Sequence, residues 1–406
     1  MIAKANPNEI DAPPVLSKTA EMPGAHFADL DISLARDIGS IEEEWRRLER
    51  REWNSLNQSL DWCRAWTTAH HSDLLALTGS VGSRILFLLP LEIVEGRFGR
   101  MARLPGGRFN NINTAFFDET LAPPNMDELR RFKTDLARCL RGLADLVVID
   151  GVPLQWKGVT HPLSDLASIE NQNHSFQLPL LGTMEATLAQ LNAKARRKKY
   201  RVQVRRLEAI GGFDHVVART SEEQHALLDR FFTQKGERLK AFGLPDVFAS
   251  TPTRDFLHGL LDAPQHGTDR PLAMHAIRLK GEHEGHIAAV TGLSRKGGHV
   301  LCQFSSIDDS VGADASPGEL LFWLAIEHGI DEEATLFDFG IGDQPYKRSW
   351  CNQETVQHDM LLPITTRGSV LSWLHLAETG IKTMIKRDHR LYALAQRLRS
   401  RRGGQD

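Results

Sequence analysis

The chain has 406 residues, of which 41% are hydrophobic and 25% are charged, and its formal net charge is -3. This composition is typical of a folded globular protein and excludes a disordered chain, a collagen and a multispan membrane protein. The length predicts two or three domains. The four cysteines form no CxxC pair, and the N-terminus has no apolar signal segment, so we expect a cytoplasmic protein.

The chain begins with a proline-rich segment and continues with a regular series of elements. Residues 1–29 contain four prolines and little periodicity, and they are expected to be a flexible lead. Hydrophobic periodicity then predicts a strand, two helices, three strands, a helix and a strand. In the second helix, Trp62 and Trp66 are expected on one face. The expected ranges are 31–36, 41–53, 60–70, 74–78, 84–94, 101–104, 126–143 and 145–150.

A second series repeats this order after residue 212, although the two copies share no strong sequence identity. The repeat predicts an α/β fold of two similar domains at residues 30–185 and 186–365, and the family resemblance given below implies a mixed sheet in each. The expected ranges are 213–219, 221–242, 253–261, 272–279, 285–293, 299–307, 317–330, 336–340, 346–350 and 355–364.

Two segments carry an excess of positive charge. Residues 188–207 are predicted to be helical, and eight Lys or Arg occur between Lys194 and Arg206 without an acid. Such a helix contacts phosphate groups, or it is a solvated face neutralised by the rest of the fold. Residues 366–406 are predicted to form a basic amphipathic helix, which lies on an anionic membrane surface or packs its stripe on the domain. The stripe consists of Val370, Leu374, Ala377, Ile381 and Met384.

The helix expected at 317–330 begins with a distinctive segment, Ser316-Pro317-Gly318-Glu319. Ser316 is a good N-cap, Pro317 suits the first helical position, and Glu319 can close a capping box. The free N–H groups of a helix N-terminus can bind an anion, and Gly318 allows a ligand to approach the backbone. Alternatively this is a well-capped helix with no ligand, and the charge of Glu319 favours that interpretation.

The strand expected at 336–340 ends in a turn with Gly340 and Gly342, which presents Asp338, Tyr346 and Lys347. Ligands of α/β sheets bind beyond the carboxyl ends of strands, where such a turn lies. An acid, a phenol and an amine there could transfer protons and hold an anion. The alternative is a structural turn with a salt bridge between Asp343 and Lys347. The histidines form no HExxH or HxH motif, so no metal is expected.

These motifs resemble those of a known family. The SPGELL segment at 316–321 and the FDFGIGDQPYK segment at 337–347 are similar to the CelD-type branch of the GCN5-related N-acetyltransferase (GNAT) superfamily. That branch is related to the FemAB-type transferases, which have two tandem GNAT-like domains. The Leu60-Asp61-Trp62 segment, the Leu89-Pro90-Leu91 strand and the basic helix ending before Gly211 extend the resemblance over residues 30–365.

The resemblance implies a degenerate first domain and a second domain that transfers an acyl group from acetyl-CoA or another acyl-CoA. The acceptor would be an amine or hydroxyl of a small molecule or saccharide, in polysaccharide or cell-envelope synthesis. The donor's pantetheine would lie between the strands at 299–307 and 336–340. In the region of the superfamily's pyrophosphate loop, this chain carries Asp308, Asp309, Gly312 and Asp314 in place of a basic residue and spaced glycines.

From this resemblance we expect Asp338 to accept the acceptor's proton, and Tyr346 and Lys347 to act on the departing thiolate. Contacts to the cofactor are expected from Phe304, Ser305, Ser316, Gly318, Glu319, Gly340 and Gly342. Two other functions stay open. FemAB-type relatives take an aminoacyl group from tRNA, which would give the basic helix a role. A non-catalytic binding subunit of a polysaccharide-assembly complex is the third.

Overall fold

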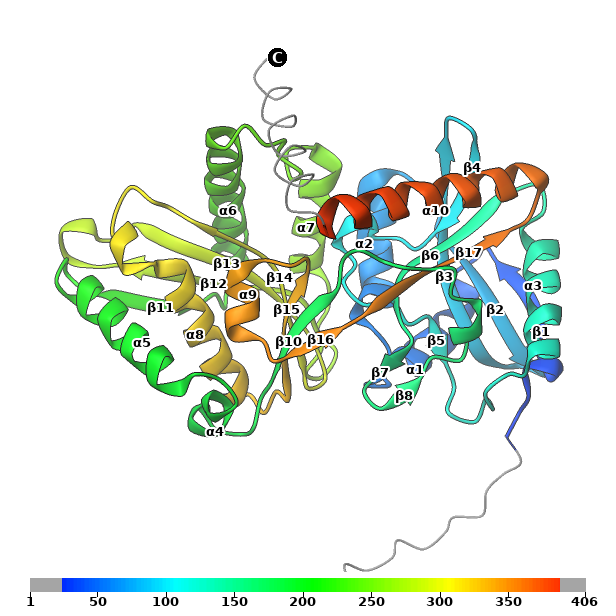
Figure 1. Cartoon of the computed structure of the whole chain (residues 1–406), viewed down its shortest axis with the longest axis horizontal. Coiled ribbons are helices and arrows are strands. Elements are labelled where there is room, and N and C mark those ends of the chain that lie inside the picture. Colours follow the sequence, from blue (N-terminus) through cyan, green and yellow to red (C-terminus); the bar gives the residue numbers. More distant parts are fainter. Residues whose placement is uncertain (1–23, 388–406) are drawn as a thin grey trace, which may run out of the picture.

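The computed structural model describes residues 24–387, which form two α/β halves side by side (Figure 1). Predictions for residues 1–23 and 388–406 lie outside this range. Residues 24–29, expected to belong to a flexible lead, instead pack on the first half, where the buried Phe27 meets Phe132 edge to face at 5.9 Å. None of the helices described is long and apolar enough to cross a membrane.

The first half is built on a mixed sheet whose strands follow the order β1-β2-β3-β4-β6-β17-β9, with β5 beside β3. Helices α1 and α2 cover one face of this sheet, and α3 covers the other. The strands are β1 (Asp31–Ala35), β2 (Leu75–Val81), β3 (Arg84–Gly96), β4 (Gly99–Arg103), β5 (Phe116–Phe117), β6 (Leu146–Pro153), β9 (Ile169–Glu170) and β17 (Gln357–Pro363). The helices are α1 (Glu42–Glu49), α2 (Leu60–His70) and α3 (Met126–Leu140). A small hairpin, β7 (Gln155–Trp156) with β8 (Val159–Thr160), stands apart from the sheet.

The second half is built on a sheet of the order β11-β12-β13-β14-β15-β10-β16. Helices α6 and α7 cover one face, and α5 and α8 cover the other. The strands are β10 (Ser175–Pro179), β11 (Phe213–Val217), β12 (Arg270–Leu279), β13 (Ile287–Lys296), β14 (His299–Ile307), β15 (Leu336–Ile341) and β16 (Gln353–Thr355). The helices are α4 (Met184–Ala189), α5 (Ala193–Glu208), α6 (Ser221–Ala241), α7 (Thr251–Asp262), α8 (Pro317–Asp331) and α9 (Pro345–Trp350). The chain then returns to the first half and ends its described part with α10 (Thr366–Arg387).

The two sheets have the same pairing pattern, which confirms the predicted repeat. In each, four antiparallel strands are followed by one parallel pair, β4 with β6 and β14 with β15. An antiparallel strand then follows, β17 in the first sheet and β10 in the second. Apart from β5, which has no counterpart in the second sheet, the strands of the two sheets therefore match one for one, although their sequences do not.

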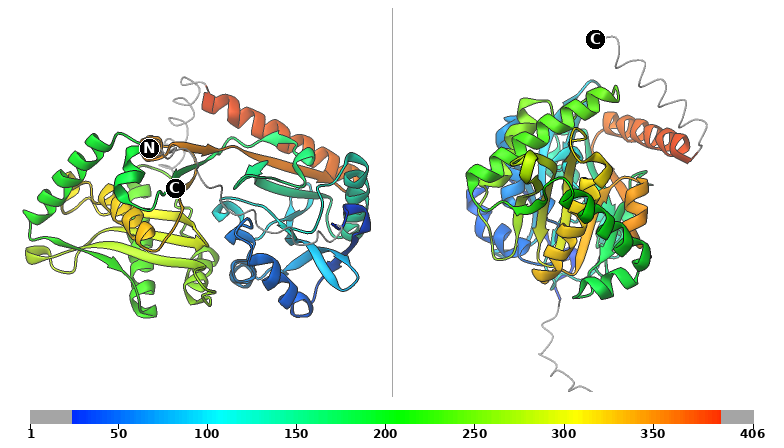
Figure 2. Two further views of the ribbon diagram at one scale, coloured as in Figure 1. Left: turned by 90° about the horizontal axis from the view of Figure 1, so that it is seen from below. Right: turned by 90° about the vertical axis from the view of Figure 1, so that its left-hand side faces the viewer.

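Strands β10 and β17, which occupy this antiparallel position, are exchanged between the halves. Each follows the elements of one half in the sequence and pairs in the sheet of the other. Strand β10 precedes the second half but completes its sheet, and β17 follows the second half but completes the first sheet. The strand predicted at 355–364 is observed as β17, which belongs to the first sheet, and the short β16, which ends at Thr355, precedes it in the second sheet. The predicted domain boundaries at residues 185 and 365 therefore do not divide the two sheets. Figure 2 shows the crossing segments between the halves.

An aromatic contact joins the halves. Trp62 and Trp66 lie on one face of α2, as predicted, and both rings meet Phe256 of α7 edge to face at 5.1 Å. Trp62 is fully buried within the core of the second half. Because α2 is fixed on α7 in this way, the loop at residues 107–111 of the first half is held against the second sheet.

His161 is a buried histidine whose hydrogen bonds require the neutral ring. Its Nε2 lies 2.9 Å from the carbonyl of Thr114 and its Nδ1 lies 3.0 Å from the N–H of Leu163. Nε2 therefore donates and Nδ1 accepts, so protonation of Nδ1 would cost the bond from Leu163. Burial lowers the pKa of His161 to about 4.

We expect this histidine to make the protein acid-sensitive. An unfolded histidine titrates near pH 6.5, so protons favour the unfolded chain as the pH falls from about 6.5 to about 4. Between pH 7 and pH 5 the contribution of His161 to the free energy of unfolding should fall by about 2 kcal/mol. Urea denaturation of His161→Gln should show a pH dependence smaller by this amount. The exposed-histidine variant His71→Asn should behave as wild type, and equal pH dependence of all three proteins would contradict the prediction.

Candidate active site

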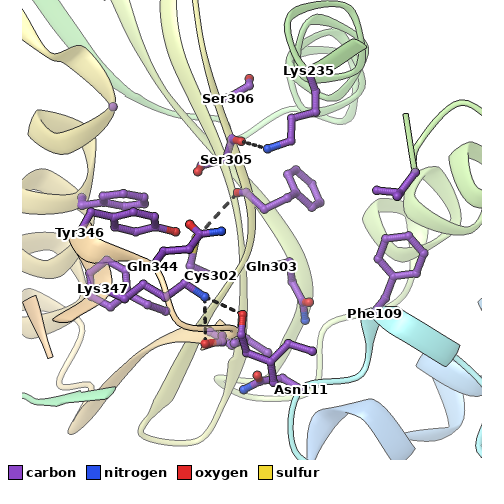
Figure 3. A pocket seen from close by; sticks show the side chains of 18 of the residues that line it. Phe109, Asn111, Lys235, Cys302, Gln303, Ser305, Ser306, Gln344, Tyr346 and Lys347 are labelled. Carbon is purple, nitrogen blue, oxygen red and sulfur yellow. Dashed lines mark hydrogen bonds between the residues drawn. The ribbon is translucent and has the colours of Figure 1, made fainter. Parts of the chain in front are cut away.

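A pocket of about 600 Å³ opens between β14 and β15, where the first half faces the second sheet. This volume is typical of a small-molecule site. Its walls come from residues 301–307 of β14, residues 339–341 of β15, the start of α8, and α9. Residues 108–111 of the first half and two lysine or arginine side chains of α6 complete it. Figure 3 shows Tyr346 and Lys347 on one side and Phe109 on the other.

The pocket exists because β14 and β15 part. The two parallel strands pair only at His299–Leu336, Val300–Phe337 and Leu301–Asp338, and β14 continues to Ile307 beside β13 alone. Beyond Leu301 the edge of β14 that faces β15 is therefore open to a ligand. This parting of two neighbouring strands confirms the geometry expected from the sequence. Phe304, Ser305 and Gly340 line the pocket, as predicted, whereas Gly342 does not.

Asp338 does not line the pocket, and the prediction that it accepts a proton from the acceptor is contradicted by its surroundings. Its side chain is fully buried. Its alternation with Phe337 and Phe339 is as predicted, but the face it occupies is covered. The carboxylate accepts hydrogen bonds from five groups: Gly340 N at 2.7 Å, Asn111 Nδ2 at 2.9 Å, Gln177 Nε2 at 3.0 Å, Ser175 Oγ at 3.1 Å and His299 Nε2 at 3.2 Å.

These bonds determine the charge of Asp338. Burial alone would raise its pKa, but the hydrogen bonds, with that of His299 foremost, outweigh burial and hold the pKa below its usual range. A carboxylate with a lowered pKa and five donors is a poor proton acceptor. Asp338 instead ties β10, β14, β15 and the loop of the first half together beneath the pocket.

Tyr346 lies in the pocket wall, as predicted. Its ring stacks on Phe322 of α8 at a centroid distance of 5.5 Å and an angle of 9°. The hydroxyl points into the pocket (Figure 3). Burial raises the pKa of Tyr346 well above its usual value. The phenol is therefore protonated at neutral pH and can donate a proton.

Lys347 also lines the pocket, but its ammonium group is held by the backbone. Its Nζ donates to the carbonyl oxygens of Gly340 at 3.0 Å and Ile341 at 2.7 Å. Burial lowers the pKa of Lys347. The alternative salt bridge with Asp343 does not form, and Asp343 pairs with Arg348 at 2.6 Å. Lys347 thus braces the turn after β15 and places a positive charge beside the pocket.

The N-terminus of α8 differs from the prediction. Ser316 has a left-handed backbone, with φ at 51°, and its side chain makes no capping hydrogen bond. Ser316 does not line the pocket, whereas Gly318 and Glu319 do. Pro317 has no N–H, and the N–H of Glu319 donates to the carbonyl of Ser316 at 3.1 Å. Because no side chain caps α8, the N–H of Gly318 is the group in the first three positions of the helix that can meet an anion.

The negative charge of Glu319, which favoured a ligand-free helix, is balanced by the basic helix. Arg196 Nη1 lies 2.7 Å from Glu319 Oε1, and Lys199 forms a second ion pair with it. Arg196 is itself buried, with its guanidinium 3.9 Å from the centre of the Trp350 ring. Residue Arg206 pairs with Asp314 in the loop before α8. One side of α5 therefore neutralises the acids around the start of α8.

Part of the pocket lining comes from the first half and from α6, which the sequence motifs did not indicate. Arg108, Phe109, Asn110 and Asn111 belong to the first half, and Lys235 and Arg238 belong to α6. Lys235 Nζ donates to the carbonyl of Ser305 at 3.2 Å, which places it over β14. The lining residues include four lysines or arginines and one acid, Glu319, so the pocket favours anionic ligands. No local motif marks these residues, because they meet only through the packing of the two halves.

The comparisons with known proteins agree with this geometry. Residues 194–348 match the family model described as Acetyltransferase (GNAT) domain. No curated protein matches the chain significantly. The second half has the GNAT fold. The predicted fold of two tandem GNAT-like units with a C-terminal helix is confirmed, whereas the CelD-type branch stays a prediction.

Among solved structures, the whole chain is similar to FemX. The TM-score is 0.55 at 10% identity, and the match covers 80% of this chain and 94% of FemX. L-PGS from Bacillus licheniformis has a TM-score of 0.47 at 11% identity, with 84% and 97% covered. A tandem GNAT protein from the clavulanic acid biosynthesis pathway has a TM-score of 0.42 at 11% identity, with 82% and 98% covered. At 10% identity, the similarity to FemX shows a common fold across both halves, and it carries no information about activity.

Proposed function

We propose that the protein is an acyltransferase that moves an acyl group from an acyl-CoA, such as acetyl-CoA, to an amine or hydroxyl acceptor. The observation that carries this proposal is the parting of β14 and β15 beside the uncapped start of α8. An extended chain with amide groups, such as pantetheine, can bond to an open strand edge, and phosphates suit a helix N-terminus.

The residues present fit such a donor. The open edge of β14 from Cys302 to Ile307 would hold the pantetheine arm. The N-terminus of α8 at Gly318 would hold the phosphates, with Glu319 already neutralised by Arg196 and Lys199. When bound, the thioester supplies an activated acyl group at the turn between β15 and α9.

Tyr346 is the general acid of the proposed reaction. A neutral amine attacks the thioester carbonyl, the carbon–sulfur bond breaks, and the sulfur takes the proton of the Tyr346 hydroxyl. The attacking nitrogen loses its own proton to water in the open pocket, and water restores the phenol. Lys347 adds a positive field near the departing thiolate. In the described part of the chain the pocket has one lining carboxylate, the ion-paired Glu319, so we assign no carboxylate as general base.

The acceptor enters between the first half and α6. Arg108 of the first half and Lys235 of α6 carry positive charge there, whereas Arg238 pairs with Asp309 at 2.7 Å, and Phe109 offers an aromatic face. This lining supports an acceptor with an acidic group, for example an acidic saccharide. A role in polysaccharide or cell-envelope synthesis, as in the CelD-type branch, is part of the proposal.

The proposal is tested by binding and by transfer. Acetyl-CoA at about 100 times its dissociation constant should add about 2.7 kcal/mol to the free energy of unfolding. Release of free thiol should then be followed with amines, amino sugars and their acidic derivatives. A chain that gains no stability from acetyl-CoA would contradict the proposal, and stabilisation without transfer to any acceptor would favour a binding subunit.

Gly318→Ala should weaken the binding of acetyl-CoA about tenfold or more, equivalent to about 1.4 kcal/mol. A Cβ atom at Gly318 would lie 2.5 Å from Cγ2 of Ile307, so the added methyl group pushes β14 and α8 apart at the phosphate end. Gly329→Ala in the same helix is the matched control, because its Cβ would meet Leu180 at an ordinary 3.7 Å. Isothermal titration calorimetry measures both, and equal affinities of the two variants would place the donor elsewhere.

A further inference from the structure

We propose that α10 is an interfacial helix that binds the surface of a membrane containing anionic lipids. The inference is independent of the transfer chemistry, because α10 packs on β4, β6 and β17 of the first half (Figure 1) and contributes no residue to the lining of the pocket. It rests on the exposure of the apolar stripe that the sequence predicts on this helix.

The stripe is exposed and does not pack on the domain. Side-chain exposure is 58% at Val370, 68% at Trp373, 41% at Leu374, 54% at Ile381 and 57% at Met384. At 3.6 residues per turn these positions fall within about 100° of the helix circumference. Five large apolar side chains therefore form one continuous ridge facing solvent. Exposed apolar patches of this kind mark interaction sites.

The opposite side of α10 fixes the direction in which the ridge points. Leu371 and Leu376 pack on Leu146, Val148 and Leu361 of the first sheet. His375 Nε2 lies 2.9 Å from Asp359 Oδ2, in a buried ion pair if the ring is protonated.

The first turn of α10 is equally constrained. A Cβ at Gly368 would lie 1.7 Å from the carbonyl oxygen of Asp145, so only glycine allows the helix to lie this close. The helix cannot roll to bury the ridge without losing these contacts. The described part of the chain therefore leaves the apolar ridge of α10 exposed, where a partner can bind it.

The charges around the ridge identify the partner as an anionic lipid surface. Arg367 and Lys382 flank it within the helix, and Lys382 also pairs with Glu378 at 2.6 Å. The sequence that follows Met384 contains seven lysines or arginines and two acids, with the basic residues at 386, 387, 390, 397, 399, 401 and 402. Tryptophan is enriched at the membrane interface, and basic residues are attracted by acidic headgroups. A second copy of the chain carries the same excess of positive charge in this segment, so charge favours an anionic surface over self-association.

Flotation of the full-length protein with vesicles tests this inference. Vesicles of equal parts phosphatidylglycerol and phosphatidylcholine should bind the protein at low salt, and phosphatidylcholine vesicles should bind it weakly. The double variant Trp373→Glu with Ile381→Glu should lower the bound fraction about tenfold or more, because two of the ridge residues no longer enter the interface. Leu181→Glu, at an exposed leucine before α4 with 52% exposure, is the matched control and should bind as wild type.

Circular dichroism and thermal melting check that the double variant is folded. Three outcomes would overturn the inference: no flotation of the wild type at low salt, full flotation of the double variant, or a dimer that only the double variant dissociates. The last would assign the ridge to a second copy of the chain. Acetyl-CoA binding is unaffected in each case, so failure here leaves the proposed transfer reaction standing.

Discussion

Replacing Tyr346 by phenylalanine is expected to lower the turnover of acyl transfer about 100-fold or more, the usual contribution of a general acid. The substitution removes one oxygen and leaves the ring stacked on Phe322. The phenol is protonated across the neutral pH range, because the pKa of tyrosine is ordinarily about 10 and burial raises that of Tyr346 further. It gives its proton to the sulfur only as negative charge develops on the departing thiolate. The Michaelis constant for the acyl donor should change little, because the hydroxyl acts when the carbon–sulfur bond breaks.

Tyr200→Phe is the matched control for this variant. The Tyr200 ring stacks on Trp323 of α8 at 4.3 Å, and it does not line the pocket. Steady-state rates with the best acceptor should be unchanged in Tyr200→Phe, and both variants should melt within a few degrees of the wild type. Full turnover in Tyr346→Phe would show that the Tyr346 hydroxyl takes no part in the reaction. Lys347 would then be the remaining pocket residue expected to act on the departing thiolate.

The fold could be predicted from the sequence because its signals are local. Hydrophobic periodicity and turn residues mark the longer strands and helices, and the same order appears twice. The short strands, such as β5, β7, β8, β9 and β10, have too few residues to show a period and were not predicted. The exchange of β10 and β17 could not be predicted in this way. The alternation of apolar and polar residues in a strand is the same whichever sheet the strand joins. The periodicity of residues 355–364 therefore does not indicate which strand they pair with. The structure shows that the chain changes sheets between Thr355 and Gln357.

The position of the candidate site could be predicted in part, because Gly318, Phe304 and Tyr346 line the pocket. The roles given to these residues stay predictions. The roles of the charged residues depend on partners far away in sequence. Glu319 is neutralised from α5 and Asp338 is covered by Asn111 of the first half, a residue separated from it by 227 positions. Charge and burial at such residues follow from tertiary packing, which no local pattern encodes.

Asp338→Asn is expected to lower the free energy of unfolding by about 3 kcal/mol, at the upper end of the usual cost of leaving buried hydrogen-bond donors without an acceptor. The carboxylate accepts five hydrogen bonds, from Asn111, Ser175, Gln177, His299 and Gly340. An asparagine there would turn its own two N–H groups toward some of these donors, which would then lack an acceptor. Because the folded pKa of Asp338 is lowered, its contribution is present above about pH 4 and is lost only as the pH falls through the folded value.

Urea denaturation at pH 7 measures this loss, with Asp343→Asn as the control in the same turn. Asp343 is exposed and pairs with Arg348 at the surface, so that substitution should cost less than about 1 kcal/mol. At a temperature where Asp338→Asn is still folded, its turnover should stay within about tenfold of the wild type, since the carboxylate lies beneath the pocket and outside its lining. An Asp338→Asn protein as stable as the wild type, with its turnover abolished, would contradict this assignment and return Asp338 to the reaction as a proton acceptor.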